Sequence, residues 1–366
     1  MTLACDFLVI GAGLPGLSLA AELASEGRVI VAEREEHPGY HATGRSAAIF
    51  SGSYGLPPVQ ALSALSRPLL EAFPTEDGVR SSLTARGIFF VAFEGDRRRT
   101  VDHMAPLPKV SPTDLCRAVP ILRPDMVLDV RHEADAADID VHAVQSGYLR
   151  LLRERGGRLM SGAAVGAARR DHGVWRVDLP HATIEARTVI DSAGAWAGQV
   201  AALFGAADPG LAPLRRSAAI VDGPQDMAVS GWPMIVNADE TLYFKPEGGR
   251  LMLSPADETP VEPHDAYAED MDIAIAVDRF MQITTLEVRQ VRTPWAGLRT
   301  FAPDRLPMIG FDPMVEGFFW LAGQGGFGIQ TAPGAARLAA ALLTGHQPDE
   351  ALRALAGPLS PGRFRR

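Results

Sequence analysis

Three glycines near the start of the chain have the spacing that a nucleotide pyrophosphate requires. Gly11, Gly13 and Gly16 follow the apolar run Phe7–Ile10, and a small-residue helix is expected over Leu17–Ser25. The first glycine allows a tight turn, the second lets the backbone approach a phosphate, and the third lets the helix lie close on a sheet. The helix N-terminus then offers free N–H groups and the positive end of its dipole. These residues predict a dinucleotide site.

An acidic residue lies where a ribose would need a hydrogen-bond acceptor. Arg28–Ala32 is expected to form a second buried strand, and Glu33 follows it, about twenty residues after the glycines. A carboxylate there accepts hydrogen bonds from ribose hydroxyls and repels a 2′-phosphate, which favours FAD or NAD over NADP. The alternative is a glycine-rich turn without a ligand. The flanking strand, helix, second strand and acid together argue against that alternative.

Further small-residue segments also point to a ligand. Thr43–Ser46 is expected to open a helix-like stretch in which N–H groups, a hydroxyl and a guanidinium could meet a pyrophosphate; the alternative is a surface loop with a capping residue. The predicted strand Thr188–Asp191 runs into Ser192–Trp196. Phe318–Ala322 is a predicted strand, followed by the glycine-rich turn Gly323–Thr331 and a helix over Ala332–Leu343. Strands that end in such turns are typical of ligand-binding sheet edges.

The chain length predicts two joined domains, because 366 residues exceed one typical core. The first is expected to be a Rossmann-like α/β domain over residues 1–84, 139–205 and 296–366. The second is expected to be an inserted α+β domain over residues 85–138 and 206–295, built on an antiparallel sheet. Within the first domain, residues 174–187 alternate like a hairpin, and Thr188–Asp191 is expected to form a separate buried strand.

Composition excludes several classes of partner. The net charge of −9 and the absence of a long basic run disfavour nucleic acid and anionic membranes. Two cysteines are too few for a disulfide framework or a thiolate metal cluster, and the nine histidines are scattered, so no metal site is expected. No stretch reaches transmembrane length without charges, and the N-terminus lacks a basic signal region. We expect a cytoplasmic protein.

The motifs together resemble the FAD-dependent D-amino acid oxidase superfamily. The similarity is carried by the N-terminal glycines with Glu33, Gly44–Ser46, Ser192–Trp196, Gly297–Arg299 and Gly323–Gly328. Within the superfamily the chain is most similar to bacterial D-arginine dehydrogenases, through strings such as Thr43–Ala48 and Trp295–Arg299. The resemblance implies an FAD-binding domain of the GR2 type and noncovalent FAD.

The resemblance also implies which residues contact the cofactor. They belong to the pyrophosphate turn, the adenosine ribose site, the segment along the ribityl chain, the adenine site and the flavin loop. They are Gly11, Gly13, Pro15, Gly16, Glu33, Arg34, Ala42, Thr43, Gly44, Arg45, Ser46, Ala47, Ala48, Val165, Gly194, Trp196, Ala296, Gly325, Gly326, Phe327, Gly328, Ile329 and Gln330.

The substrate residues that the resemblance implies form a carboxylate clamp. Arg216 and Arg299 would hold the carboxylate, Tyr54 and Tyr243 would supply hydroxyls, and the carbonyl of Gly326 would face the amine. A bidentate guanidinium suits a planar carboxylate, and fixing that end would orient Cα–H toward the flavin. The alternative for the arginines is a solvated residue and a structural ion pair. For the tyrosines it is a half-buried ring with a satisfied hydroxyl.

Two positions depart from the D-arginine enzymes. Ile49 stands where they have a histidine, and Ile88 stands where they have the glutamate that receives the guanidinium. Desolvating an unpaired cation costs several kcal/mol, so we expect poor use of D-arginine and D-lysine. Ile49, Phe50, Ile88 and Phe90 would favour an apolar side chain, although alternate strand residues face opposite ways and only one set can line a pocket.

The expected activity is oxidation of the Cα–N bond of a D-amino acid that has an apolar side chain. Hydride transfer to FAD would leave an imine, and water would convert it to a 2-oxo acid and ammonia. The alternatives are a secondary amine, an imino acid or a 2-hydroxy acid as substrate, or a flavin-binding protein without catalysis. The electron acceptor, either oxygen or a quinone-type molecule, stays open.

Overall fold

The structure of the protein is a computed structural model that describes residues 1–75 and 77–364. The strands are β1 (Thr2–Ile10), β2 (Val29–Ala32), β3 (Ile49–Phe50), β4 (Phe73–Thr75), β5 (Gly78–Arg80), β6 (Leu83–Ala85), β7 (Ile88–Phe93), β8 (Val127–Glu133), β9 (Ala137–Ile139), β10 (Arg158–Met160), β11 (Ala167–Asp171), β12 (Val174–Leu179), β13 (Ala182–Asp191), β14 (Ala212–Val221), β15 (Met234–Asn237), β16 (Tyr243–Glu247), β17 (Arg250–Ser254), β18 (Thr259–Pro260), β19 (Val291–Phe301), β20 (Met308–Phe311) and β21 (Phe318–Ala322). The α-helices are α1 (Leu14–Leu23), α2 (Pro57–Glu71), α3 (Pro112–Ala118), α4 (Val141–Glu154), α5 (Ala197–Leu203), α6 (Asp270–Ile283), α7 (Ala332–Thr344) and α8 (Glu350–Leu359).

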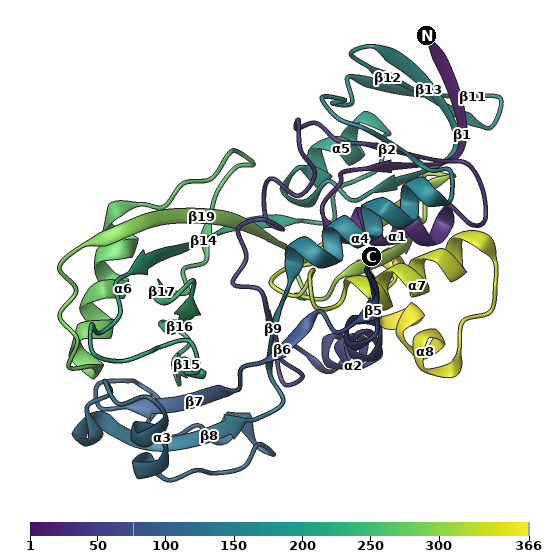
Figure 1. The fold of residues 1–366 in the computed structure, drawn as a ribbon. Coiled ribbons are helices and arrows are strands. Elements are labelled where there is room, and N and C mark those ends of the chain that lie inside the picture. Colours follow the sequence, from purple (N-terminus) through teal and green to yellow (C-terminus); the bar gives the residue numbers. More distant parts are fainter. Residues whose placement is uncertain (76, 365–366) are drawn as a thin grey trace.

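The first sheet is the nucleotide-binding type that the glycine motif predicts. Its parallel strands lie in the order β10-β2-β1-β13-β21, and β20 adds an antiparallel edge next to β21. The carboxyl ends of β1, β2 and β13 meet in register, because Ile10 pairs with both Ala32 and Asp191. Helices α1, α4 and α7 pack on this sheet (Figure 1). The segments that follow these three strands are thereby brought to one edge.

Strand β13 joins two expected elements into one. The sequence indicates a hairpin strand over 183–187 and a separate buried strand over 188–191, whereas the structure has a single strand over Ala182–Asp191. Its first half pairs antiparallel with β12, and it pairs in parallel with β1 over its length and with β21 at its end. The meander β11-β12-β13 therefore extends directly from the nucleotide-binding sheet.

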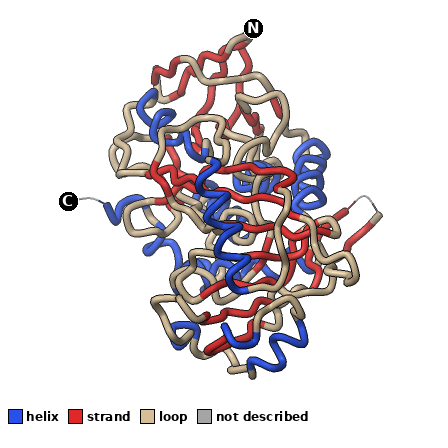
Figure 2. Tube along the Cα trace, turned by 90° about the vertical axis from the view of Figure 1, so that its left-hand side faces the viewer, coloured by secondary structure: helices blue, strands red, loops and turns tan. Residues whose placement is uncertain are grey.

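The second sheet forms the other strand-rich part of the molecule. Its order is β18-β14-β17-β16-β15-β7-β8, with β19 also paired to β14. In Figure 1 this sheet lies away from the N-terminal sheet, and the turned view in Figure 2 shows strand-rich regions toward both ends of the molecule. Strand β19 stays paired with β14 as far as Phe301, so it crosses the expected domain boundary at residue 296.

The expected antiparallel arrangement of this sheet is wrong at one pairing. Strands β7 and β15 run parallel, with Met234 opposite Ile88, while the other pairings are antiparallel. A long crossover joins these two strands in the chain, and such a connection permits a parallel pair where a hairpin cannot. One face of the sheet packs on α6, where Phe280 contacts Phe244. The other face carries Ile88, Met234 and the neighbouring residues of a separate apolar cluster.

The segment after Thr43 is not helical, contrary to the expectation. Residues 41–46 form turns, Ala48 has a φ of 53°, and Ile49–Phe50 is a short strand that pairs with β9. Glycine and small polar residues stabilise a helix poorly, and the pairing with β9 supplies the backbone partners of residues 49 and 50. Within residues 1–75 and 77–364, none of the helices has the length and apolar character of a membrane span.

Candidate active site

One cavity of about 1460 Å³ holds nearly all of the predicted site residues. Its lining comes from the carboxyl edge of the first sheet and from the inner face of the second. All six predicted substrate residues line it, together with all but three of the predicted cofactor residues. The three exceptions are Gly16, Gly44 and Ala296, each of which has a chain neighbour that lines the cavity.

The glycine turn has the geometry of a phosphate cradle. Gly11 has a φ of 102°, and a Cβ there would lie 2.4 Å from the carbonyl oxygen of Ser192. A Cβ on Gly16 would lie 2.1 Å from the carbonyl oxygen of Gly11, so this glycine permits the close packing of α1 on the turn. At Gly13 a Cβ would meet only Thr43 Oγ1, at 3.4 Å, and Pro15 Cδ, at 3.9 Å. The first and third glycines are needed for packing, and the second keeps the cavity side open.

Glu33 is fixed at the predicted ribose position. It is 7% exposed, and its carboxylate accepts hydrogen bonds from the backbone N–H groups of Ala12 (2.7 Å) and Glu35 (3.0 Å). Beside it, the guanidinium of Arg34 stacks 4.6 Å from the ring centre of Trp196. The Trp196 ring also lies 4.5 Å from His41. The Glu33 carboxylate, which can accept hydrogen bonds, and the aromatic rings of Trp196 and His41 therefore lie next to the glycine turn. Both features suit the binding of an adenosine.

The segment from Ala42 to Ala48 contacts the glycine turn through Thr43. Thr43 Oγ1 accepts a hydrogen bond from the N–H of Leu14 at 3.0 Å, so it helps to cap α1. Arg45 bonds the carbonyl oxygens of Tyr40, Ala266 and Ala296 and forms an ion pair with Asp265. All of its guanidinium nitrogens thus bond protein oxygens. The side chain of Arg45 holds the surrounding loops, and these contacts use four of its five N–H groups.

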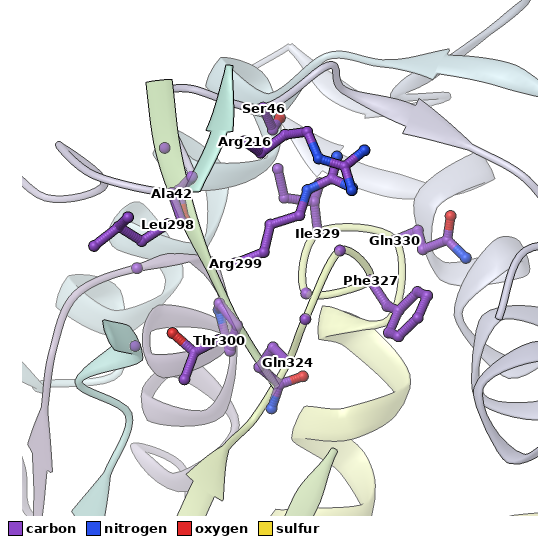
Figure 3. Close-up of a pocket in the computed structure, with 18 of the residues that line it drawn as sticks. Ala42, Ser46, Arg216, Leu298, Arg299, Thr300, Gln324, Phe327, Ile329 and Gln330 are labelled. Atoms are coloured by element: carbon purple, nitrogen blue, oxygen red, sulfur yellow. The ribbon is translucent and has the colours of Figure 1, made fainter. Parts of the chain in front are cut away.

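The glycine-rich loop after β21 is tied to the first half of the chain. Gln330 is 2% exposed and bonds both the N–H and the carbonyl of Ser51, at 3.2 and 3.1 Å. Gly325 has a φ of 52°, and a Cβ there would lie 2.4 Å from the Phe301 ring. Figure 3 shows Phe327, Ile329 and Gln330 around this loop, next to the strand that carries Arg299. The loop is held rigidly where the predicted flavin ring would lie.

The two predicted arginines converge. Their guanidinium groups lie next to each other in Figure 3, one from β14 and one from β19, which are paired strands. Arg299 Nη1 lies 3.3 Å from the hydroxyl of Tyr54. Arg216 pairs with Glu258 at 3.1 Å, and its buried Nε has no hydrogen-bond partner. Alternation along β14 turns the neighbouring Arg215 the other way, onto Asp272 of α6.

The charge balance at this pair leaves excess positive charge. Burial and the neighbouring Arg299 lower the pKa of Arg216. Burial also opposes the charge on Arg299, but Tyr54, Tyr243 and Glu258 outweigh it and raise its pKa. Glu258 is shared, because it also pairs with Arg305 at 2.8 Å. The guanidinium groups of Arg216, Arg299 and Arg305 therefore lie near a single carboxylate, that of Glu258. An anionic ligand would neutralise part of the remaining positive charge.

The cavity wall beyond the arginines is apolar. Ile88, Met234, Met252 and Tyr243 form its buried part, with Ile49 and Phe90 packed against them. Phe50 does not belong to this wall. It is 1% exposed and lies in the core of the first domain, because its neighbour Ile49 takes the cavity side of the short strand.

Sequence reasoning missed several polar residues that line the cavity. Glu258 follows β17 and reaches back to Arg216. Glu133 ends β8 and accepts hydrogen bonds from Ser51 and Ser53. These contacts join strands that are far apart in the sequence, so no local spacing could reveal them. Within residues 1–75 and 77–364, no group of three or more His, Cys, Asp or Glu side chains is arranged to hold a metal.

The fold and the site together define a class of protein. A Rossmann-type sheet, an open Gly13, a fixed acid at the ribose position and a second glycine loop fit FAD, and the chain binds this cofactor. An arginine pair at the inner face of a second sheet is where a carboxylate substrate would lie. These are the parts of a flavoprotein oxidoreductase.

Comparison with known proteins gives the family. Residues 6–342 match the family described as FAD dependent oxidoreductase (DAO), and the chain belongs to it. Glycine oxidase of Pseudomonas aeruginosa is 26% identical over 96% of this chain and 99% of its own length. The crystal structure of L-proline dehydrogenase from P. horikoshii superposes with a TM-score of 0.83 at 19% identity, covering 100% of this chain and 98% of that one.

A longer relative has a similar level of identity. Mitochondrial dimethylglycine dehydrogenase of Rattus norvegicus is 24% identical over 98% of this chain but only 45% of its own length. The chain therefore spans less than half of that relative. The comparisons thus establish the chain as a member of the FAD-dependent oxidoreductase family.

Proposed function

We propose that the protein oxidises the Cα–N bond of an amino acid, with a D-amino acid as the first candidate. The observation that carries the proposal is the pair of guanidinium groups at the inner face of the second sheet. In the reaction Cα–H leaves with two electrons and the nitrogen gives up a proton, so the amine becomes an imine. Water then converts the imine to a 2-oxo acid and ammonia. FAD supplies the hydride acceptor when it is bound.

The chain's own residues would bind and orient the substrate. The guanidinium groups of Arg299 and Arg216 would donate hydrogen bonds to the substrate carboxylate. The Tyr54 hydroxyl, 3.3 Å from Arg299 Nη1, would donate to the same carboxylate. The carbonyl of Gly326 would take an amine N–H. With the carboxylate and amine fixed, the Cα–H bond has one orientation, and this is the main contribution the protein can make by positioning.

The second candidate is a secondary amine or imino acid. Its support is that similar proteins are named glycine oxidase, dimethylglycine dehydrogenase and L-proline dehydrogenase. An arginine clamp recognises only the carboxylate, so it does not distinguish a primary from a secondary amine. The specific resemblance to D-arginine dehydrogenases stays a prediction, as do the D configuration and the electron acceptor.

We also propose which domain binds FAD and which contacts the substrate. Residues 1–84, 139–205 and 296–366 would bind FAD, and residues 85–138 and 206–295 would carry the substrate wall. The placement of β1, β2, β13 and β21 in the first sheet and of β7, β8 and β14–β18 in the second supports this division.

Anaerobic reduction of the purified yellow protein tests the proposal. The panel should contain D- and L-amino acids, sarcosine, D-proline and 2-hydroxy acids, and the signal is bleaching of the flavin. We expect bleaching by primary D-amino acids. Bleaching by sarcosine or proline alone would transfer the assignment to secondary amines, and bleaching by none of these compounds would contradict the proposed reaction.

A further inference from the structure

Glu258 is a cavity residue that the proposed reaction does not use. It lies in the chain between β17 and β18, and it lines the same cavity as the carboxylate clamp of Arg216 and Arg299. One of its oxygens, Oε1, accepts hydrogen bonds from two arginines, from Nη2 of Arg216 at 3.1 Å and from Nη2 of Arg305 at 2.8 Å. A single carboxylate oxygen therefore bridges the clamp and a third guanidinium group.

The exposed fractions of these side chains place Glu258 between the clamp and the solvent. The side chain of Arg216 is 13% exposed, that of Glu258 is 35% exposed and that of Arg305 is 48% exposed. Burial raises the pKa of the Glu258 carboxyl, but the three neighbouring guanidinium groups outweigh burial and lower this pKa below its ordinary value. The carboxyl is therefore an anion at neutral pH, and it lies between two cations.

Arg305 has a second support besides Glu258. Its guanidinium carbon lies 3.9 Å from the ring centre of Phe301, which ends β19 and is 3% exposed. A guanidinium group over the face of an aromatic ring is attracted by the electrons of that ring. If the charge of Glu258 were removed, Arg305 would therefore stay beside the clamp, and its Nη2 could bond another anion.

The apolar wall of the cavity offers no partner to a second carboxylate. Ile88, Met234 and Met252 are buried in this wall, and none of these side chains carries a hydrogen-bond donor. Since an unpaired carboxylate is costly to desolvate, a second carboxylate would be favoured at the arginines. The Nη2 atoms of Arg216 and Arg305 bond one oxygen, so they are at most two hydrogen-bond lengths apart. The two carboxylates of a short diacid have a comparable separation.

We propose that Glu258 is a specificity-determining residue, which occupies the position that a second substrate carboxylate would need and so restricts the site to substrates with one carboxylate. The excluded class is the dicarboxylic amino and imino acids. A second carboxylate at this position would compete with Glu258 for Nη2 of Arg305, and the two like charges would repel each other. This inference rests on the proposed function and refines it, because it names a class of substrate that the site rejects.

Succinate and succinamate form a matched pair for the test, because they have nearly the same size and differ in the charge of one end. Neither contains an amine, so neither can be oxidised at Cα–N. Calorimetric titration of the FAD-loaded wild type should show that succinate binds no more tightly than succinamate. Glu258→Gln removes the charge but keeps an acceptor oxygen. In this variant the affinity for succinate relative to succinamate should rise by about tenfold, the low end for a charged hydrogen bond, because the position is partly exposed.

Two further variants locate the effect. Glu262→Gln removes the same charge from an exposed residue outside the cavity lining, and it should keep the wild-type ratio of the two affinities. The double variant Glu258→Gln with Arg305→Gln also removes the expected partner of the second carboxylate, so its ratio should return to the wild-type value. A gain that persists in the double variant, or that is missing in Glu258→Gln, would overturn the proposal. So would tighter binding of succinate by the wild type, or binding of neither compound by any variant.

Kinetic measurements connect this selectivity to the proposed reaction. Glutamine and glutamate, each as D and L forms, differ in the charge of the side chain, and kcat/KM is measured for both. We expect the wild type to prefer glutamine, and Glu258→Gln to raise the ratio of glutamate to glutamine activity by about tenfold. Equal changes for both amino acids would mean that Glu258 only holds Arg216 in place, which contradicts the proposal. If no amino acid bleaches the flavin, the proposed function fails, while the titration still decides the role of Glu258.

Discussion

At the scale of single residues, the side chain with the clearest expected role is Arg299. Arg299→Lys keeps the charge but removes the planar fork that matches a carboxylate. We expect kcat/KM to fall by about 100-fold, since disrupting a buried charged contact costs on the order of 2–5 kcal/mol. Arg292→Lys is a matched control, because Arg292 lies on the same strand and forms an exposed pair with Asp222. A loss below threefold in Arg299→Lys would assign Arg299 a structural role.

Gly326 gives a second prediction at this scale. A Cβ there would lie 2.8 Å from the Tyr54 hydroxyl and 2.9 Å from Arg299 Nη1. Both atoms end flexible side chains, so Gly326→Ala should displace the clamp with little loss of stability. We expect a fall of about tenfold in kcat/KM with flavin content unchanged. Gly231→Ala, where nothing lies within 4 Å of the new Cβ, should behave as the wild type in the same assays. Unchanged kinetics in Gly326→Ala would contradict this account.

What could be predicted for single residues depended on whether the partner was local. Gly11, Gly13, Gly16 and Glu33 belong to one strand-turn-helix-strand unit, so their spacing in the chain was enough to predict that they lie together. Glu133 could not be found in this way. It lies opposite Ile88, 45 positions earlier, and it bonds Ser51 and Ser53, which lie in the loop after β3. Cross-strand register decides which of these side chains share a face, and the sequence alone does not give that register.

At the scale of elements, strand β13 ends in a buried acidic residue, Asp191. Asp191 is fully buried, and its Oδ2 has no hydrogen-bond partner. Burial raises its pKa to about 8, helped by Asp208 and opposed by the N–H of Ala193. The folded protein therefore keeps this proton up to about pH 8, whereas the unfolded chain releases it near pH 4.

The sign of the resulting pH dependence follows from proton counting. Between about pH 4 and 8 the folded state binds more protons than the unfolded state, so the free energy of unfolding falls as pH rises and levels off above pH 8. Asp191→Asn removes this titration and should be more stable than the wild type above pH 8, by several kcal/mol at most. Chemical unfolding with saturating FAD at pH 6 and pH 9 checks this. Parallel pH profiles for the two proteins would mean that Asp191 is solvated.

Elements were predicted where periodicity and end signals agreed. Strand β21, for example, spans the expected residues Phe318–Ala322. Strand β13 and the parallel pair β7–β15 could not be derived in full. Strand length and partner choice there are decided by residues more than 100 positions away. The helix expected after Thr43 failed for the same reason, because β9 pairs with Ile49–Phe50.

At the scale of the whole molecule, a partly buried ion cluster joins the second sheet to the small sheet β3-β9-β6. Asp138 on β9 bonds Lys245 of β16 at 3.0 Å and Arg86 Nε at 2.7 Å. The side chain of Lys245 is only 3% exposed, and Glu247 is its other partner, at 2.9 Å. The same β9 residue pairs with Ile49 of the segment beside the FAD site. This cluster therefore connects the substrate wall to the cofactor side of the cavity.

Removing one charge from this cluster should lower the free energy of unfolding of the protein. Asp138→Asn leaves two cations facing a neutral amide, and breaking a buried pair from one side costs about 3 kcal/mol. We expect a fall of that order in the free energy of unfolding, measured by denaturant titration, while Asp135→Asn stays near the wild type because its side chain is 73% exposed. The clamp residues do not touch Asp138, so KM for the preferred substrate should change little. If stability holds but KM rises several-fold, the cluster sets the relative position of the two sheets more than it stabilises them.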